Sequence, residues 1–208
     1  MALFRRSGAT PPASAAAAGS EELGVPAFHH LVEVLEKTPE RKYEILDLGP
    51  ASGNHVAFFS RFRCRFHIGS LEETLPEWLQ KDEEAPPPEP PRLLPLAEGV
   101  RLDLILCWEL LNYLDEYGLA RLADHLQSRT APGAWLHAFV HTKATMPAAP
   151  GRFRLLAPDR MEWVRDDRET VPAPRYPRRT LERLMPGLTV RQSRLLRNGL
   201  QEYLFQSP

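Results

Sequence analysis

Four residues in a short stretch have the types and the spacing of a ligand-binding loop. Asp47 ends an apolar run, and Gly49, Ala51 and Gly53 follow it at alternate positions. Residues with small side chains let a ligand approach the backbone, and a carboxylate accepts hydrogen bonds. The spacing is not that of a dinucleotide fingerprint or a Gly-Lys-Ser/Thr phosphate loop. The structural alternative is a tight turn that packs a helix against a strand.

Five further candidates lie at or after the ends of two other apolar runs: Trp108, Glu109, Asn112 and Tyr113 follow Cys107, and His141 ends the later run. Glu109 or His141 could remove a proton from a substrate, and Asn112 with Tyr113 could bind a polar substrate. Each has a structural alternative. Glu109 could stabilise a helix N-terminus, His141 could bond to the backbone at a strand end, and Tyr113 could belong to the core.

The histidines and cysteines give no metal or disulfide signal. The seven histidines show no spacing typical of a metal site. Two cysteines, Cys64 and Cys107, exclude a disulfide scaffold and a multi-cysteine zinc module. Cys107 lies within an apolar run, so we interpret it as packing rather than as a nucleophile.

Alternating helical and extended patterns must position these residues. Helices are predicted from Pro26 to about 38, over 54–62, after a cap at Asp115, and near 178–185. Strands are predicted over 43–48, 64–68, 102–107, 134–141, 188–195 and 200–205, with a turn at Pro132-Gly133 before the fourth and an Asn198-Gly199 hairpin between the last two. Such alternation predicts a doubly wound α/β sheet, whose ligands bind at the carboxyl ends of the strands.

The 21 prolines divide the chain into one domain and its appendages. We expect a disordered tail over 1–20, a domain over 21–208, a stiff proline-rich linker over 85–91 and a proline- and arginine-rich candidate lid over 143–177. No run of residues resembles a secretory signal or approaches the ~18 apolar residues of a membrane span. We therefore expect a cytoplasmic protein without membrane association.

The charge gives little reason to expect a nucleic-acid partner. The formal net charge is −1, although residues 151–208 hold 12 arginines and 7 acidic residues. Arginine pairs well with carboxylate and phosphate, so an anionic substrate is one interpretation of this segment. Scattered surface arginines are the other.

Asp47-Leu-Gly49-Pro-Ala51-Ser-Gly53 resembles motif I of the class I S-adenosylmethionine-dependent methyltransferases, D-x-G-x-G-x-G. The segment Leu102–Leu114 is similar to that family's fourth strand and the loop after it, and the order of elements is similar over about 25–206. The resemblance implies a Rossmann-like, mostly parallel seven-stranded sheet that ends in a C-terminal antiparallel hairpin.

The resemblance also assigns roles to individual residues. It implies that S-adenosyl-L-methionine is the cofactor, with Asp47 beside its amino group and Gly49, Ala51 and Gly53 as the close-approach loop. Ser70 and Trp108 complete the implied cofactor contacts. Ala51 replaces a family glycine, and Ser70 stands near the place of the acid that holds the ribose hydroxyls. His55 could touch the cofactor's carboxylate, or be an exposed residue of the first helical turn.

We therefore predict a methyltransferase that acts on a small-molecule acceptor by direct methyl transfer. The alternative is a catalytically silent methyltransferase-like binding module, which the serine at position 70 suggests. A nucleic-acid methyltransferase is a third hypothesis, but the Asn/Asp-Pro-Pro-Tyr/Phe signature is absent after the fourth strand. The sequence identifies neither the acceptor nor the oligomeric state.

Overall fold

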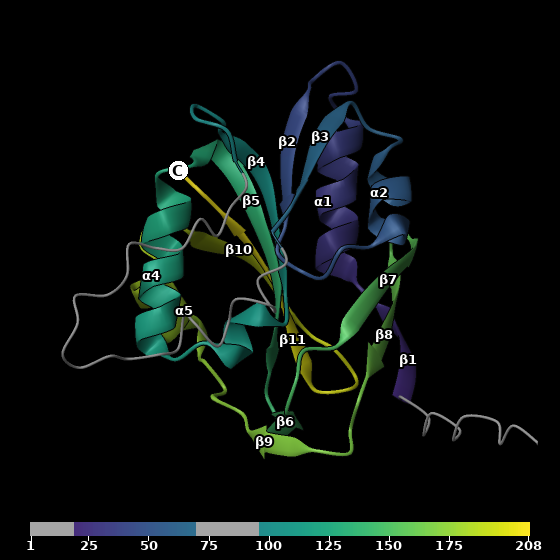
Figure 1. The fold of residues 1–208 in the computed structure, drawn as a ribbon, viewed down its shortest axis with the longest axis vertical. Helices are drawn as coiled ribbons and strands as arrows, with labels where there is room; N and C mark the ends of the chain where they lie inside the picture. Colours follow the sequence, from purple (N-terminus) through teal and green to yellow (C-terminus); the bar gives the residue numbers. More distant parts are fainter. Residues whose placement is uncertain (1–18, 70–95) are drawn as a thin grey trace, which may run out of the picture.

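The fold is known from a computed structural model that describes residues 19–69 and 96–208. Its main sheet has six strands in the order β10-β11-β5-β4-β2-β3 (Figure 1). In chain order these strands are β2 (Tyr43–Asp47), β3 (Cys64–Ile68), β4 (Leu102–Trp108), β5 (Thr130–His141), β10 (Thr189–Leu195) and β11 (Leu200–Gln206). β2 to β5 pair in parallel, and β11 runs antiparallel to both of its neighbours.

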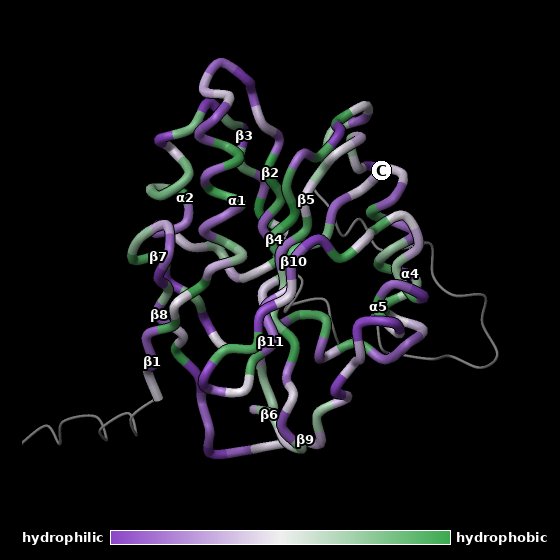
Figure 2. Tube along the Cα trace, turned by 180° about the vertical axis from the view of Figure 1, so that it is seen from behind, coloured by the Kyte–Doolittle hydropathy of each residue, from purple (hydrophilic) through white to green (hydrophobic). Residues whose placement is uncertain are grey.

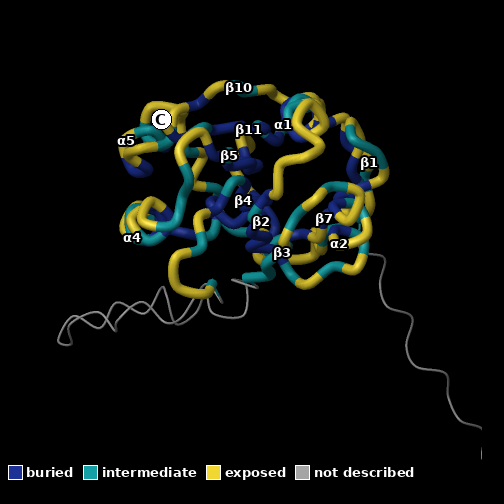
Figure 3. The backbone as a smooth tube through the Cα atoms, turned by 90° about the horizontal axis from the view of Figure 1, so that it is seen from above, coloured by how far each residue is buried: buried dark blue, intermediate teal, exposed yellow. Residues whose placement is uncertain are grey.

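Helices cover both faces of this sheet, as the alternating pattern predicts. α1 (Pro26–Glu36) and α2 (Gly53–Phe59) lie on one face, and α4 (Glu116–Gln127) and α5 (Arg178–Leu184) lie on the other (Figure 1). Figures 2 and 3 show apolar, buried strands between helices whose outer surfaces are exposed. One hydrophobic cluster fills the space on each side of the sheet. The α/β class is therefore confirmed.

The predicted strand count is only partly reproduced. The main sheet contains six described strands of mixed direction, where the resemblance implied seven. Between β3 and β4, residues 70–95 lie outside the described part, and residues 96–98 form no strand. Near the C-terminus β10 and β11 form an antiparallel pair, with Gly199 at φ 89° in the connection between them.

Pro132-Gly133 does not form the predicted turn before a strand. Both residues lie inside β5, which begins at Thr130. Here β5 holds extra residues relative to β4, because Leu102 pairs with Thr130 whereas Leu104 pairs with Trp135. Gly133, at φ 75°, takes the conformation that this irregularity needs, and its N–H donates to the carbonyl of Pro208.

A smaller sheet lies beside α1 and α2, in the order β1-β8-β7. Its strands are β1 (Gly19–Gly24), β7 (Arg152–Ala157) and β8 (Arg160–Arg165). Gly19 and Ser20 pair with Arg165 and Val164, so the predicted disordered tail over 1–20 is wrong for its last two residues. Residues 1–18 and the linker at 85–91 lie outside the described residues.

The segment 143–177 is built from strands, which the sequence did not predict. It contains β7 and β8 together with the short antiparallel pair β6 (Thr145–Pro147) and β9 (Thr170–Pro172). Along β7, Phe153 and Leu155 are buried while Arg152 and Arg154 are exposed. This period of two is the pattern of a half-buried strand, and the surrounding prolines obscured it.

α1 is fixed at its first turn by a carboxylate from β11. Glu202 is fully buried, and its oxygens accept the backbone N–H groups of Ala27 and Phe28 at 3.0 and 2.9 Å. His137 on β5 lies 3.0 Å from the same carboxylate. A negative charge at this end of a helix is favourable, so Glu202 ties α1 to the hairpin. Within the described residues, no helix has the length and apolar composition needed to span a bilayer.

Candidate functional site

Many of the residues that the sequence singled out line one cavity or lie directly behind its wall. Its volume is about 500 Å³, and it lies where β2 and β4 end. The wall is formed by residues 48–55, 107–110 and 150–154 together with Val164. The first group contains the glycine loop. The second is the end of β4 with the two residues after it, and the third is the start of β7 with the two residues before it. Cavities of roughly 300–1,000 Å³ are typical of small-molecule sites.

Asp47 is buried behind the glycine loop, where it contacts three protein groups. Its Oδ1 accepts the N–H of Gly49 at 3.0 Å and the indole N–H of Trp108 at 2.5 Å. Its Oδ2 lies 2.6 Å from Nδ1 of His55. Since Nε2 of His55 faces the carbonyl of Phe153 at 2.8 Å, that nitrogen carries a proton. A second proton must then lie between Nδ1 and Oδ2, so the pair has no net charge.

Trp108 closes the space above the first glycine. Its backbone has φ 48°, a left-handed conformation that is costly for a bulky residue. The indole lies between the rings of His55 and Phe153, with centroid distances of 4.6 and 5.4 Å. A Cβ atom at Gly49 would lie 2.7 Å from this indole, whereas a Cβ at Gly53 would meet nothing within 4 Å. The loop is therefore packed at Gly49 and open at Gly53.

This difference predicts opposite outcomes for two alanine substitutions. Gly49→Ala should displace the indole from Asp47 and lower the free energy of unfolding by about 1–3 kcal/mol. Gly53→Ala, at the first residue of α2, should change the free energy of unfolding by less than about 0.5 kcal/mol. Urea unfolding of both variants measures this. Equal losses of unfolding free energy in the two variants would show that the Trp108 indole does not exclude a side chain at position 49.

Three side chains hold the outer edge of β7, which pairs with no strand among the described residues. Asn54 bonds to both the N–H and the carbonyl of Leu155, at 2.7 and 3.1 Å. His55 donates to the carbonyl of Phe153. Glu109 accepts the N–H of Gly151 at 2.8 Å. Asn54 and His55 lie in the first turn of α2, and Glu109 follows β4. Residues 151–155 are therefore fixed both to α2 and to the end of β4.

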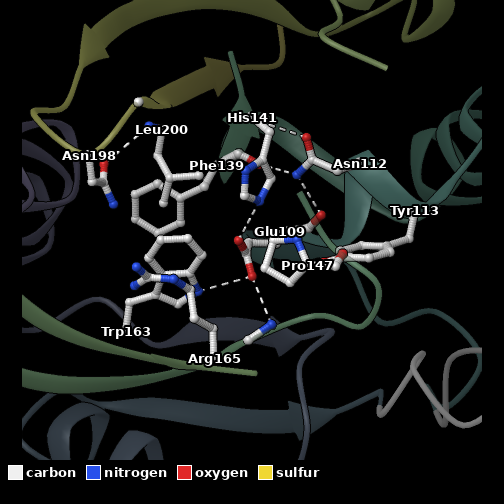
Figure 4. A network of polar contacts seen from close by, with 12 residues as sticks. Glu109, Asn112, Tyr113, Phe139, His141, Pro147, Trp163, Arg165, Asn198 and Leu200 are labelled. Carbon is white, nitrogen blue, oxygen red and sulfur yellow. Dashed lines mark hydrogen bonds and ion pairs between the residues drawn. The ribbon is translucent and has the colours of Figure 1, made fainter. Parts of the chain in front are cut away.

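Glu109 is the centre of a second buried network (Figure 4). Its Oε1 lies 2.7 Å from Nε2 of His141, and its Oε2 accepts the indole N–H of Trp163 at 3.1 Å as well as the N–H of Gly151. Glu109 is fully buried and His141 is 4% exposed. A Cβ at position 151 would lie 2.3 Å from the Trp163 indole nitrogen, so only glycine leaves room for this contact.

The two candidate substrate-binding residues also bond within the protein. The amide of Asn112 donates to the carbonyls of Glu109 and Phe139 and accepts the N–H of His141. The hydroxyl of Tyr113 donates to the carbonyl of Pro147 at 3.1 Å (Figure 4). Neither residue lines the cavity. Both hold together the elements behind it.

Only some of the predicted site residues line the cavity. Gly49, Ala51, Gly53, Trp108 and Glu109 line the cavity, and Asp47 lies behind them. His141 reaches the wall through Glu109, and Ser70 lies outside the described residues.

Two wall residues were missed or misjudged in the sequence. His55 is 2% exposed, so the expectation of an exposed first-turn residue is wrong. Asn54 attracted no attention, because a polar residue at the start of a helix is ordinary. What reveals the role of both is the contact with β7, about a hundred residues away in the chain.

Cys107 lines the cavity yet is completely buried. Burial, helped by the nearby negative charge of Asp47, raises the pKa of its thiol far above the ordinary value. A thiol that stays neutral is a poor nucleophile. This agrees with its interpretation as packing within β4.

Comparison with known proteins gives one family and several similar folds. A family model described as a methyltransferase domain matches residues 22–188. No curated protein sequence matches this chain.

Three solved structures illustrate the similarity in fold. The pyocyanin biosynthetic protein PhzM has 16% identity and a TM-score of 0.45, over 88% of this chain and 54% of its own. The Burkholderia thailandensis 1,6-didemethyltoxoflavin-N1-methyltransferase has 17% identity and a TM-score of 0.45, over 87% and 78%. The N-methyltransferase NodS of Bradyrhizobium japonicum WM9 has 13% identity and a TM-score of 0.45, over 88% of this chain and 89% of its own. This chain therefore spans about half the length of PhzM.

Proposed function

This chain belongs to the methyltransferase-domain family, and on that premise we propose that it transfers the methyl group of S-adenosylmethionine directly to a small-molecule acceptor. The observation that carries the proposal is the single cavity of about 500 Å³ whose wall combines the glycine loop, the end of β4 and β7. A cofactor on the loop and an acceptor against β7 would share this space. The transfer needs the two to be adjacent and aligned.

The residues present fit the cofactor. The loop is open at Gly53, and Ala51 adds only a methyl group, so the backbone there can be approached closely. We propose that Gly49, Ala51, Gly53 and Trp108 line the cofactor site and that Asp47 holds the loop in shape through the N–H of Gly49. The ribose contact assigned to Ser70 rests on the resemblance alone.

The bound cofactor would supply an electrophilic methyl group on a sulfonium. The chain's own contribution is alignment and the exclusion of water from a largely apolar wall. Glu109 and His141 remain the candidates for a base, but each is bonded to the other. We therefore propose that they act first as positioning residues for β7, with Asn112 and Tyr113 behind them.

Calorimetry with S-adenosylhomocysteine and a methyl-transfer assay test the proposal. We expect saturable binding to the purified chain, and transfer of label from methyl-labelled S-adenosylmethionine to members of a panel of small hydroxyl- and amine-bearing acceptors. A lack of binding at millimolar ligand would overturn the proposed function. Binding without transfer to any acceptor would favour the alternative of a catalytically silent binding module.

A further inference from the structure

Arg152 differs from the other arginines of the small sheet in its ion pairing. Arg154, Arg160 and Arg165 each pair with a glutamate on a neighbouring strand, at 2.9, 3.2 and 3.1 Å. Arg152 lines the cavity and has no ionic partner within residues 19–69 and 96–208. An exposed arginine that forms no internal pair is available to a ligand.

The backbone on both sides of Arg152 is fixed. The N–H of Gly151 donates to Glu109, and the carbonyl of Phe153 accepts from His55. Arg152 itself pairs in the strand with Val164 on β8. A guanidinium carried by a backbone held at both neighbours loses less freedom on binding than one on a loose loop.

Glu109 in the cavity wall and Asp47 behind it do not compete for this arginine. One oxygen of Asp47 is paired with His55, and its other oxygen accepts two N–H groups. Both oxygens of Glu109 are covered by the N–H donors of His141, Gly151 and Trp163. Neither carboxylate lies within ion-pair distance of Arg152.

We propose that Arg152 forms an anion subsite within the cavity that binds a carboxylate or phosphate group of the ligand. A planar guanidinium can bind either group with two parallel hydrogen bonds. The assignment of this anion to a methylation substrate rests on the proposed function. Its source is either the acceptor or the amino-acid end of the cofactor, and the two are separable by experiment.

The subsite is tested with inorganic phosphate alone. We expect phosphate to produce saturable shifts of the backbone amide resonances of residues 151–154 in the wild-type chain. Arg152→Gln should abolish them, whereas Arg160→Gln, which removes an arginine outside the cavity wall, should not. Shifts that are absent from the wild type, or equal in wild type and Arg152→Gln, would overturn the subsite.

Binding of two nucleosides distinguishes the two possible sources of the anion. 5′-Methylthioadenosine lacks the carboxylate that S-adenosylhomocysteine carries. If Arg152→Gln weakens S-adenosylhomocysteine about tenfold or more and leaves 5′-methylthioadenosine unchanged, Arg152 binds the cofactor's carboxylate. If neither changes, the phosphate site belongs to the acceptor. If the wild type binds neither nucleoside, the proposed function fails, and the phosphate titration still decides the subsite.

Discussion

Asp47→Ala is expected to lower the free energy of unfolding by about 3–5 kcal/mol, because it leaves several buried donors without an acceptor. The carboxylate accepts from Gly49 and Trp108 and holds His55 at 2.6 Å. Its loss should also release the indole of Trp108, which the left-handed backbone otherwise holds over Gly49. Urea unfolding measures the stability, and calorimetry with S-adenosylhomocysteine measures the effect on the loop.

Asp47→Asn is the matched control. The amide oxygen can accept from Gly49 and Trp108, and the amide nitrogen can donate to Nδ1 of His55, whose Nε2 carries its proton toward the Phe153 carbonyl. Gly49, Trp108 and His55 each keep a hydrogen-bond partner, so we expect a loss of at most about 1 kcal/mol. If Asn destabilises the fold as much as Ala does, the charge rather than the hydrogen bonding of Asp47 maintains the loop.

Glu109→Ala is expected to have an effect of similar size, about 3–5 kcal/mol, and to act on β7. It removes the acceptor of the Gly151 N–H, the Trp163 indole N–H and His141. Amide hydrogen exchange should therefore accelerate most in residues 151–155 and in β8. Unchanged protection there would show that Glu109 does not hold the cavity wall.

Glu109→Gln separates this positioning role from a role as base. The glutamine oxygen can accept from Gly151 and Trp163, and its NH₂ can donate to His141 in the tautomer that carries its proton on Nδ1. We expect near-normal stability and protection of β7. Methyl transfer that persists in Glu109→Gln supports positioning, whereas a loss of transfer with normal binding of S-adenosylhomocysteine identifies the carboxylate as the base.

The elements that the sequence predicted correctly are those with a strong local signal. β2 and β4 are mostly apolar runs, and β3 alternates apolar with polar residues. Asp115 accepts the N–H of Gly118 as a helix cap, and Asn198-Gly199 lies in the terminal hairpin. These signals operate over a few residues. The loop from Asp47 to Gly53 belongs to the same kind, because its small residues are needed wherever a strand leads into a helix beside a ligand.

The elements that were missed depend on distant partners. β1 pairs with β8 across about 140 residues, and β5 extends through Pro132-Gly133 because β4 and the chain end bond to it. The strands of 143–177 are short, and prolines end them or lie between them, so their alternation is visible only once the buried side is known. Pairing energy from another part of the chain overrides local preference in each case.

The residue types of the loop and the order of strands and helices follow from the amino-acid sequence, because each depends on neighbours in the chain. Which carboxylates are already engaged is decided by the tertiary structure. Asp47 and Glu109 look like free acids in the sequence, yet each is surrounded by donors from β4, β5, α2 or the small sheet. Arg152 is free for the same reason, since strand pairing gives its neighbours acidic partners and gives Arg152 none among the described residues.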